Sequence, residues 1–560
     1  MIDTKVERKY KMNIQNPIIP GMAPDPSIIR VGDIYYLATS TFHWNPAIQI
    51  FQSADLANWE LIDYAIKEGE VNLRGTNTPA GIWAPHLSYD YEAKKYWLAY
   101  SHMVNMAGRE FNSDSYAIWA ENIRGPWSEP IYLTSIGFDP AIYHDDNGKK
   151  YMAILEWETR EGYQAPGHIV IAEVDLEKGG IIGKWQRINH GFTTRGCAEA
   201  PQIYKRNDYY YLLIAGGGTG YAHGVEIGRS KNIFGPYEPH PTGEPIITSS
   251  PRHLFSLGNP DAGQFGMYNP ESVMQKAGHG SLVETTTGEW YISHLMSRPL
   301  EGTLLNPLGR ETAIQKMHWT KEGWLEMKDG SNLAKMEVEG IIGKDVETTV
   351  THNVEDDFND AYHCRFMTPY RNQEVAWVNT IERPGYLRIY GSDSFFSQVN
   401  PAIMATRATS FNYQLETKVE FHPDHYSETA GVGLYYDSNN WLYLHLSYSE
   451  EKAIPLLTVL QAKHGKRIEY SNNCFPVKQG IVELKLSYDH GQADLFYRLE
   501  EDWILFVEEI DVSYLSDEGV NGEPGEIGGF TGLFNFVGSV DAHQHDSFAD
   551  FSYYYVKNKV

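Results

Sequence analysis

The stretch DPSIIRVGDIYYLATS, residues 25–40, decides the fold because similar stretches recur along the chain. In each copy a small or acidic residue stands before Pro, or before Gly in the last copy, and an Ile or Leu, a turn and an aromatic strand follow. The other copies are APHLSYDYEAKKYWLAYS (84–101), DPAIYHDDNGKKYMAILE (139–156), APQIYKRNDYYYLLIAGG (200–217) and HGSLVETTTGEWYISHLM (279–296). Self-similarity at a regular period is typical of repeat architectures.

A second, looser hairpin follows each copy. Its outer strand ends at an aromatic residue in every unit: Trp59, Trp127, Trp185, Tyr237, and Trp319 or Trp324. Two hairpins of alternating strands with almost no helical periodicity indicate a four-stranded propeller blade. We therefore predict an all-β protein with a five-bladed β-propeller, and the alternative is a large sandwich with fortuitous internal similarity.

The repeat stops after Trp324, and a different β pattern follows. Apolar and polar residues alternate in NYQLETKVEFH (412–422), AGVGLYYDSNNWLYLHLSY (430–448), GIVELKLSYD (480–489) and DSFADFSYYYV (546–556). This alternation predicts a concanavalin-like or lectin-like β-sandwich. We expect the propeller over residues 1–335, a linker over 336–355 and the sandwich over 356–560. The sandwich braces the propeller, binds carbohydrate or forms an oligomer interface, and bracing is the default.

Composition excludes several classes of partner. The 560 residues include 46 Lys and Arg against 73 Asp and Glu, a formal net charge of −27. Such a chain repels nucleic acid and anionic membrane surfaces. The three cysteines, Cys197, Cys364 and Cys474, cannot form a disulfide framework, and the N-terminus shows no apolar signal segment. We expect a cytoplasmic protein that forms a homo-oligomer, a dimer or a tetramer.

The residues that begin the five repeats carry the functional signal. They are Asp25, Ala84, Asp139, Ala200 and His279, with Glu199 one position before Ala200. Inner strands of a propeller begin near its axis, so Asp25, Asp139 and Glu199 should face one another. Each Asp-Pro alone is most simply a turn residue. Gathering three like charges at one axis is costly without a task, which favours a functional site.

Crowded carboxylates suit the cleavage of glycosidic bonds. Their mutual repulsion separates their pKa values, so that one group stays ionised while another keeps its proton. A carboxylate base then activates water on one face of the sugar, and a carboxylic acid protonates the leaving oxygen on the other. Inverting enzymes separate this pair by about 6.5–9.5 Å.

The segments PDPSI, GIWAPHLSY, FDPAIY, AEAPQIY, GHGSLVET and LGRETA resemble glycoside hydrolase family 43, in its two-domain group of β-xylosidases and α-L-arabinofuranosidases. The resemblance extends over nearly the whole chain. It implies that Asp25 is the general base, that Glu199 is the general acid, and that Asp139 orients Glu199 and raises its pKa. It also implies inversion in one displacement, with no covalent intermediate and no required cofactor.

The same resemblance suggests further site residues. Arg310 in LGRET would lie near the substrate and the base, although a surface arginine is the alternative. His279 would complete the floor of the funnel, as a hydrogen-bonding residue or as a contact for a calcium ion at the propeller axis. Phe42, Trp44 and Trp83 could stack on sugar faces or pack in the core. Phe534 or Phe536 would reach the pocket from the sandwich.

Four features depart from the family pattern, and we expect them to affect the choice of substrate. They are Asn45 after Trp44, Gln202, Gly216, and an insertion over residues 257–271.

Together these features predict an exo-glycosidase that releases xylose from the nonreducing end of β-1,4-xylo-oligosaccharides. The first alternative is a mainly α-L-arabinofuranosidase, since the two substrates present similar geometry. A noncatalytic carbohydrate-binding propeller would require a missing carboxylate, and all three are present. Retaining fructosidases carry Asn-Asp-Pro-Asn-Gly and Arg-Asp-Pro motifs, where this chain has APDPSI and FDPAI.

Overall fold

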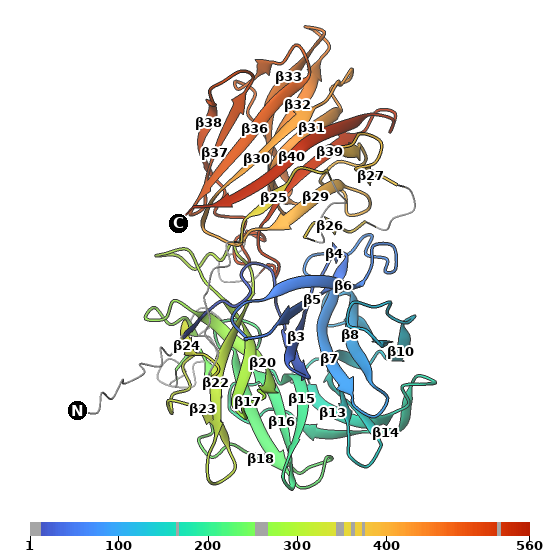
Figure 1. Ribbon diagram of the computed structural model, residues 1–560, viewed down its shortest axis with the longest axis vertical. Helices are drawn as coiled ribbons and strands as arrows, with labels where there is room; N and C mark the ends of the chain where they lie inside the picture. Colours follow the sequence, from blue (N-terminus) through green and yellow to red (C-terminus); the bar gives the residue numbers. More distant parts are fainter. Residues whose placement is uncertain are drawn as a thin grey trace, which may run out of the picture.

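The computed structural model describes residues 13–163, 167–251, 267–342, 352–359, 365–371, 376–522 and 528–559. Two all-β bodies lie one above the other, with the N-terminal body below and the C-terminal body above (Figure 1). Cys364 and most of the insertion over 257–271 lie outside the described residues. Within the described part of the chain, no helix combines the length and apolar character needed to cross a membrane.

The lower body is the predicted five-bladed propeller. Each blade is an antiparallel sheet built from one continuous stretch of chain, and its first strand faces the axis. Blade 1 contains β2 (Ser27–Val31), β3 (Ile34–Thr39), β5 (Ala47–Ser53) and β6 (Glu60–Ile66). Blade 2 contains β7 (Gly81–Asp90), β8 (Lys95–Asn105), β9 (Asn112–Ala120) and β10 (Ile131–Thr134). Blade 3 contains β11 (Gly137–His144), β12 (Lys150–Trp157), β13 (Gly167–Val174) and β14 (Ile181–Asn189). Blade 4 contains β15 (Glu199–Arg206), β16 (Tyr209–Gly216), β17 (Gly224–Ser230), β18 (Glu238–Pro239) and β19 (Ile247–Thr248), and blade 5 contains β20 (Gln275–Glu284), β21 (Trp290–Ser297), β22 (Glu311–Trp319) and β23 (Leu325–Met327).

The residue that begins each repeat has the same unusual backbone conformation. Positive φ angles of 43° to 59° occur at the five equivalent positions Asp25, Ala84, Asp139, Ala200 and His279. In blades 2 to 5 the register of the inner hairpin shifts at this point. Bulges next to a functional site redirect side chains. The repeat found in the sequence is therefore also a repeat of local backbone geometry at the axis.

The ring closes outside the blades. β1 (Asn13–Gln15), which precedes blade 1, pairs antiparallel with β24 (Glu337–Glu339), which follows blade 5. Ile14 on β1 is fully buried, in a cluster that also holds residues of blades 1 and 5. The first and last blades are thereby joined by backbone hydrogen bonds as well as by apolar packing.

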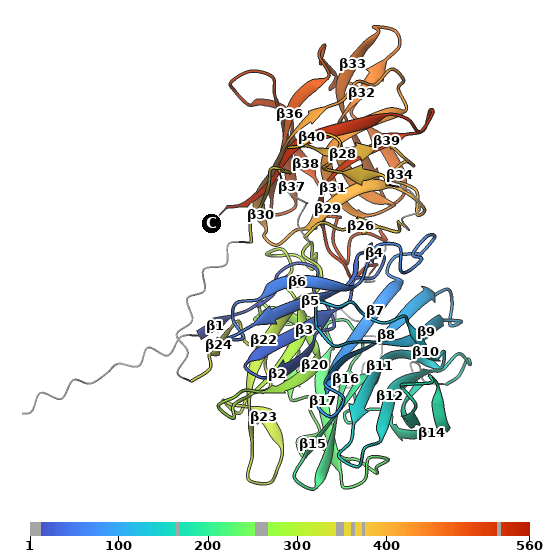
Figure 2. The same ribbon diagram turned by 45° about the vertical axis from the view of Figure 1, so that its right-hand side comes forward.

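The upper body is a two-sheet sandwich, as the alternating pattern predicts (Figure 2). One sheet contains β25 (Val354–Asp356), β27 (Val378–Asn379), β28 (Leu387–Tyr390), β30 (Asn412–Glu420), β36 (Ile481–Asp489), β37 (Gln492–Arg498), β38 (Ile504–Asp511) and β40 (Phe548–Asn558). The other contains β29 (Ala402–Arg407), β31 (Glu428–Asp437), β32 (Asn440–Ser449), β33 (Ile454–Lys463), β34 (Lys466–Glu469), β35 (Phe475–Pro476) and β39 (Phe534–Asp541). The predicted boundary at 335 falls just before β24 and the one at 355 falls within β25, and both stay predictions.

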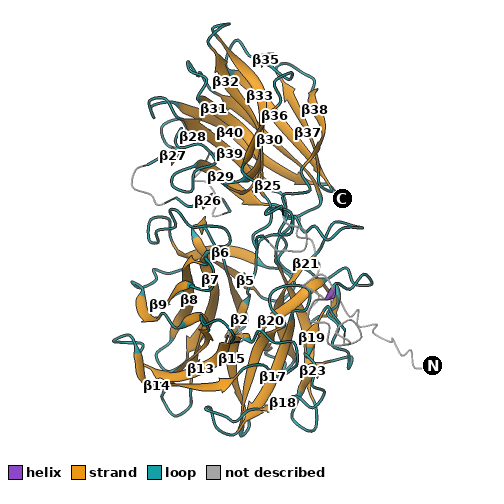
Figure 3. Cartoon of the chain, turned by 180° about the vertical axis from the view of Figure 1, so that it is seen from behind, coloured by secondary structure: helices purple, strands orange, loops and turns teal. Residues whose placement is uncertain are grey.

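The two bodies share one apolar core. The Trp44 ring of β4 (Trp44–Asn45) stacks on Phe534 of the sandwich, with centroids 3.7 Å apart. β4 also pairs with β26 (Thr368–Pro369), so a two-stranded sheet crosses the interface (Figure 1). Figure 3 shows β26 on the side of the sandwich that faces the propeller. Phe42 and Trp83 of the propeller belong to the same buried cluster. The sandwich therefore braces the propeller through packing of the kind found inside a domain.

The shared core gives a stability prediction. Phe534→Ala should lower the free energy of unfolding by about 3–5 kcal/mol, because it leaves a cavity against Trp44 in a fully buried site. Guanidinium titration measures this loss. The control is Ile381→Ala, which truncates a side chain that is 86% exposed and should change stability little. Equal losses in the two variants would contradict a shared interdomain core.

Candidate active site

Asp25 and His279 form the first half of the site. Asp25 lies just before β2 and His279 on β20, and His279 Nδ1 is 3.3 Å from Asp25 Oδ1. Ser40 Oγ donates a hydrogen bond to Asp25 Oδ2 at 2.7 Å. Burial acts to raise the pKa of Asp25, but the charge and hydrogen bond of His279, together with Arg310 and Ser40, outweigh it and hold this pKa below its ordinary value. Asp25 is thus kept as an anion.

Asp139 and Glu199 form the second half, on the adjacent blades 3 and 4. The Ala200 backbone N–H donates to Asp139 Oδ2 at 3.1 Å, which ties the two strand heads together. Burial, followed by the charge of Asp139, raises the pKa of Glu199 to about 8. Burial also raises the pKa of Asp139, to about 6, against the charge of His279. Glu199 therefore keeps its proton under conditions in which Asp25 has lost its own.

Arg310 approaches this group from the segment that precedes β22. Its guanidinium lies over the ring of Phe530, 3.7 Å from the ring centroid, and its Nη2 is 3.4 Å from the Thr219 carbonyl oxygen. The positive charge of Arg310 lowers the pKa values of Asp25 and Glu199. Arg310 is buried, which excludes the alternative of a surface arginine.

A pocket of about 160 Å³ joins these groups. Its walls contain an almost continuous series of aromatic rings: Phe42, Trp83, Phe111, Phe138, Trp157 and Phe530. Flat apolar ring faces are suited to the apolar faces of sugars. A small pocket that contains carboxylates fits one terminal sugar better than the middle of a long chain.

Three predicted pocket residues lie elsewhere. Trp44, Phe534 and Phe536 are fully buried in the interdomain core and do not line the pocket. Phe534 and Phe536 are on β39, whose two faces are both covered, and Trp44 is held by its stacking on Phe534. The sandwich phenylalanine at the pocket is Phe530, from the loop before β39. The structure thus places a sandwich phenylalanine at the pocket, but that residue is Phe530 and not Phe534 or Phe536.

Several lining residues were not found from the sequence, among them Met106, Phe111, Phe138, Trp157, Thr219, His223 and Leu295. Phe138 directly precedes Asp139 in FDPAIY, so its position offered a usable signal. Phe111 and Trp157 stack on each other at 4.1 Å, but they lie 46 residues apart in an aromatic-rich chain. Nothing in the sequence around Phe111 and Trp157 distinguishes these pocket-lining rings from aromatic residues that pack inside the blades.

Three of the four departures from the family pattern, Asn45, Gln202 and Gly216, do not line the pocket. Asn45 donates from Nδ2 to the Arg371 carbonyl oxygen at 2.7 Å, in the domain interface. Gln202 accepts a hydrogen bond from Tyr204, and Gly216 packs against Glu226. None of the three lines the pocket, so an influence on substrate choice would have to be indirect.

A larger cavity, of about 570 Å³, lies at the opposite end of the propeller axis. Two of its charged side chains, Lys150 and Asp90, form an ion pair with each other. The pocket at the strand heads differs because the pKa values of two of its carboxyls, Asp25 and Glu199, are shifted in opposite directions. That pocket is the candidate active site.

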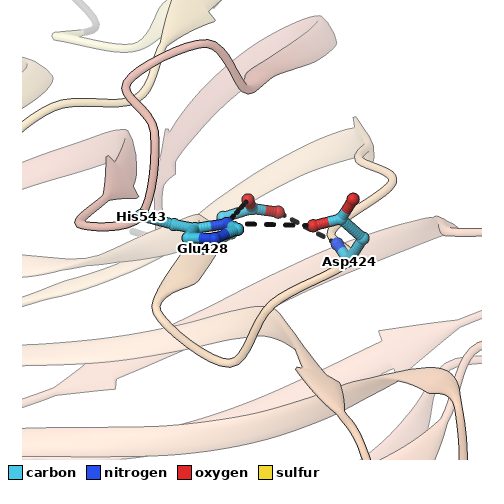
Figure 4. A group of neighbouring side chains, drawn as sticks. All are labelled: Asp424, Glu428 and His543. Atoms are coloured by element: carbon cyan, nitrogen blue, oxygen red, sulfur yellow. Dashed lines mark hydrogen bonds and ion pairs between the residues drawn. The ribbon is translucent and has the colours of Figure 1, made fainter.

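A metal role for His279 stays a prediction. Calcium takes six to eight oxygen ligands, whereas His279 offers a nitrogen that already faces Asp25. Among the described residues, three side chains of the sandwich, Asp424, Glu428 and His543, bring possible metal-ligand atoms within 4.8 Å of one another (Figure 4). There Glu428 accepts hydrogen bonds from His543 Nδ1 at 3.2 Å and from the Asp424 backbone N–H at 2.9 Å. These bonds explain the grouping without a cation.

Comparison with known proteins identifies the family. Residues 14–325 match the model of "Glycosyl hydrolases family 43", and residues 355–557 match "Beta xylosidase C-terminal Concanavalin A-like domain". The chain belongs to glycoside hydrolase family 43. This confirms the resemblance drawn from the strand-head motifs, and it shows that the chain is a glycoside hydrolase.

Relatives of this family 43 enzyme match it over its whole length. It is 35% identical to a xylosidase/arabinosidase 43B of Humicola insolens, with 97% of each chain covered. It is also 35% identical to a β-xylosidase of Bacillus subtilis, with 98% of this chain and 100% of the relative covered. The crystal structure of a xylan β-1,4-xylosidase from Bacillus halodurans superposes with a TM-score of 0.89 at 37% identity, covering 97% of this chain and 100% of that one.

The pairing of His279 with Asp25 predicts the pH dependence of this family 43 enzyme. We expect Asp25 to act as the ionised base and Glu199 as the protonated acid, so kcat/KM should fall on the alkaline side near pH 8, where Glu199 loses its proton. His279 lowers the pKa values of both carboxyls, so His279→Gln should raise both and move the whole bell-shaped profile to higher pH.

The control for this profile is His445→Gln. His445 is a buried histidine of the sandwich that does not line the pocket. Its replacement should leave both limbs of the profile in place. An unmoved acid limb in His279→Gln would contradict the role given to the His279–Asp25 pair.

Proposed function

We propose that this enzyme hydrolyses β-1,4-xylo-oligosaccharides from the nonreducing end, in one displacement with inversion at the anomeric carbon. The observation that carries the proposal is the division of pKa values within one pocket. The pKa of Asp25 is held low and that of Glu199 is raised to about 8, which divides base from acid.

In the proposed reaction Asp25 takes a proton from water, which attacks the anomeric carbon. Glu199 gives its proton to the leaving oxygen at the same time, so both carboxyls end in the opposite protonation state. Asp139 maintains the acid form of Glu199 through its charge and through its bond to the Ala200 N–H. Arg310 binds a hydroxyl of the terminal sugar, and the aromatic walls stack on its apolar face. The chain itself supplies acid, base and cation, so we propose that no cofactor is needed.

Two features support the substrate class. The pocket is small and receives Phe530 from a second domain, which suits removal of one terminal unit. The B. halodurans structure is that of a xylan β-1,4-xylosidase, and the H. insolens relative is named a xylosidase/arabinosidase. Arabinofuranoside hydrolysis is accordingly the second candidate.

Proton NMR on xylotriose tests the proposal directly. The expected first products are α-xylose, with the inverted configuration, and xylobiose. Initial formation of β-xylose would overturn inversion, and products from internal cleavage of longer oligomers would overturn exo action. Initial rates on nitrophenyl xyloside and nitrophenyl arabinofuranoside decide between the two substrates, and faster arabinoside turnover would reverse our choice.

Substitutions separate the acid from the base. Asp25→Asn and Glu199→Gln should each reduce turnover of xylobiose by about 10² to 10⁴. Nitrophenolate departs without a proton, so Glu199→Gln should recover much of its rate on a nitrophenyl glycoside. Asp25→Asn should not, because its attacking water stays unactivated. Circular dichroism checks that both variants are folded, and equal behaviour on the two substrates would contradict the assignment.

A further inference from the structure

The segment that carries Arg310 is held by the sandwich. The Leu533 N–H donates to the Pro307 carbonyl oxygen at 2.8 Å, and the Asp517 N–H donates to the Asn306 carbonyl oxygen at 3.2 Å. Gly309 approaches the sandwich backbone so closely that a Cβ there would lie 2.6 Å from the Gly532 nitrogen. The backbone just before Arg310 therefore takes its position from the second domain.

Two buried carboxylates of the sandwich, Asp517 and Glu518, lie against this segment. Glu518 is satisfied, since it pairs with Lys276 of β20 and accepts the Asn306 N–H at 2.8 Å. Asp517 Oδ1 accepts hydrogen bonds from the Tyr436 hydroxyl at 2.6 Å and from the Gly532 N–H at 3.2 Å. Asp517 Oδ2 is buried and has no hydrogen-bonding partner among the described residues.

Arg310 also has a buried polar atom without a hydrogen-bonding partner among the described residues. This atom is Nε, and the guanidinium forms no ion pair within 4 Å in the described part of the chain. Burial lowers the pKa of Arg310, and the charge that most strongly opposes this effect is Asp517, ahead of Asp25. Charges act over longer distances in a poorly solvated interior than in water. Lys276 forms its ion pair with Glu518 and also acts on Asp517, whereas the carboxylate that acts most strongly on Arg310 is Asp517.

We propose that Asp517 is a positioning residue for the reaction: its carboxylate, supplied by the sandwich, balances and orients the Arg310 guanidinium over the pocket. This inference rests on the proposed function, in which Arg310 binds the sugar beside Asp25. Glu199 and Asp25 belong to the propeller, but the carboxylate that balances the charge of Arg310 belongs to the sandwich.

A shift in pH dependence distinguishes positioning from mere support. Without the Asp517 charge, the positive charge of Arg310 acts more fully on Glu199 and lowers its pKa further. The alkaline limb of kcat/KM then moves to lower pH, and KM rises because the guanidinium is no longer oriented. A purely structural defect lowers activity at every pH and moves no limb. The titratable groups that face Asp517 are Glu518, Lys276, Arg310, Tyr436 and Tyr221.

The experiment compares Asp517→Asn with Asp437→Asn in the full-length chain. Both aspartates are buried in the sandwich and have pKa values raised by burial to about 6. Asp437 is not among the main charges acting on Arg310, and it accepts a hydrogen bond from Asn440 that an amide oxygen can still accept. The substrate is a methyl glycoside of the sugar that the wild type hydrolyses fastest. An alkoxide leaving group needs the proton of Glu199, so the alkaline limb of its hydrolysis reports the pKa of Glu199 whichever sugar is used.

We expect Asp517→Asn to lower kcat/KM roughly threefold or more, mainly through KM, and to shift the alkaline limb to lower pH. In an Arg310→Gln background the same change should have little further effect, because the two residues act as a unit. Asp437→Asn should leave both limbs in place. Native KM and limbs in folded Asp517→Asn, or full additivity with Arg310→Gln, would overturn the proposal.

Tyr436→Phe is the second variant, in case Asp517→Asn does not fold. It keeps the ring and removes the hydroxyl that stabilises ionised Asp517. It should raise the pKa of Asp517 and shift the alkaline limb in the same direction by a smaller amount, and an unmoved limb would count against the proposal. A wild type inactive on all glycosides would defeat the proposed function itself. If the wild type is active but Asp517→Asn and Tyr436→Phe leave KM and the alkaline limb unchanged, only the role of Asp517 is contradicted.

Discussion

Burial of three carboxylates at one axis is the constraint on which the rest of the structure depends. Left-handed backbone conformations at non-glycine residues cost about 1–3 kcal/mol each, and five of them head the inner strands. Mutual repulsion adds to that cost. The positive charges of His279 and Arg310 offset part of this cost. They stabilise the ionised form of Asp25 more than that of Glu199, and this difference separates the pKa values of the two carboxyls.

This balance of charge requires both domains. The propeller supplies Asp25, Asp139 and Glu199, whereas the sandwich supplies the Phe530 ring under the Arg310 guanidinium and the backbone contacts that fix the segment before it. The interface is correspondingly apolar, with Trp44 and Phe534 stacked at its centre. A sandwich of this kind completes the active site as well as supporting it.

The strand heads could be predicted from the sequence because a repeat converts distant positions into equivalent ones. Asp25, Asp139 and Glu199 are recognisable for that reason, and His279 follows from the fifth copy. Phe530 lies in a loop, where no periodicity assigns a direction to its side chain. Phe534 and Phe536 stand on a strand buried on both faces, so alternation could not tell core from pocket. Trp44 is buried at the domain interface, where β4 pairs with a strand more than 300 residues away, and the sequence around Trp44 carries no signal of that pairing.

Each blade uses one uninterrupted stretch of chain, so the ring has a seam between blades 1 and 5. The β1–β24 pair spans this seam at the side of the propeller. The sandwich spans it again from above, since it contacts blade 1 through the β26–β4 pair and the segment before β22 of blade 5 through Pro307 and Gly309. The first and last blades are therefore connected at two separate places, by the β1–β24 pair and by the sandwich. In the reaction proposed above, this double connection would hold the spacing between Asp25 of blade 1 and Glu199 of blade 4 constant.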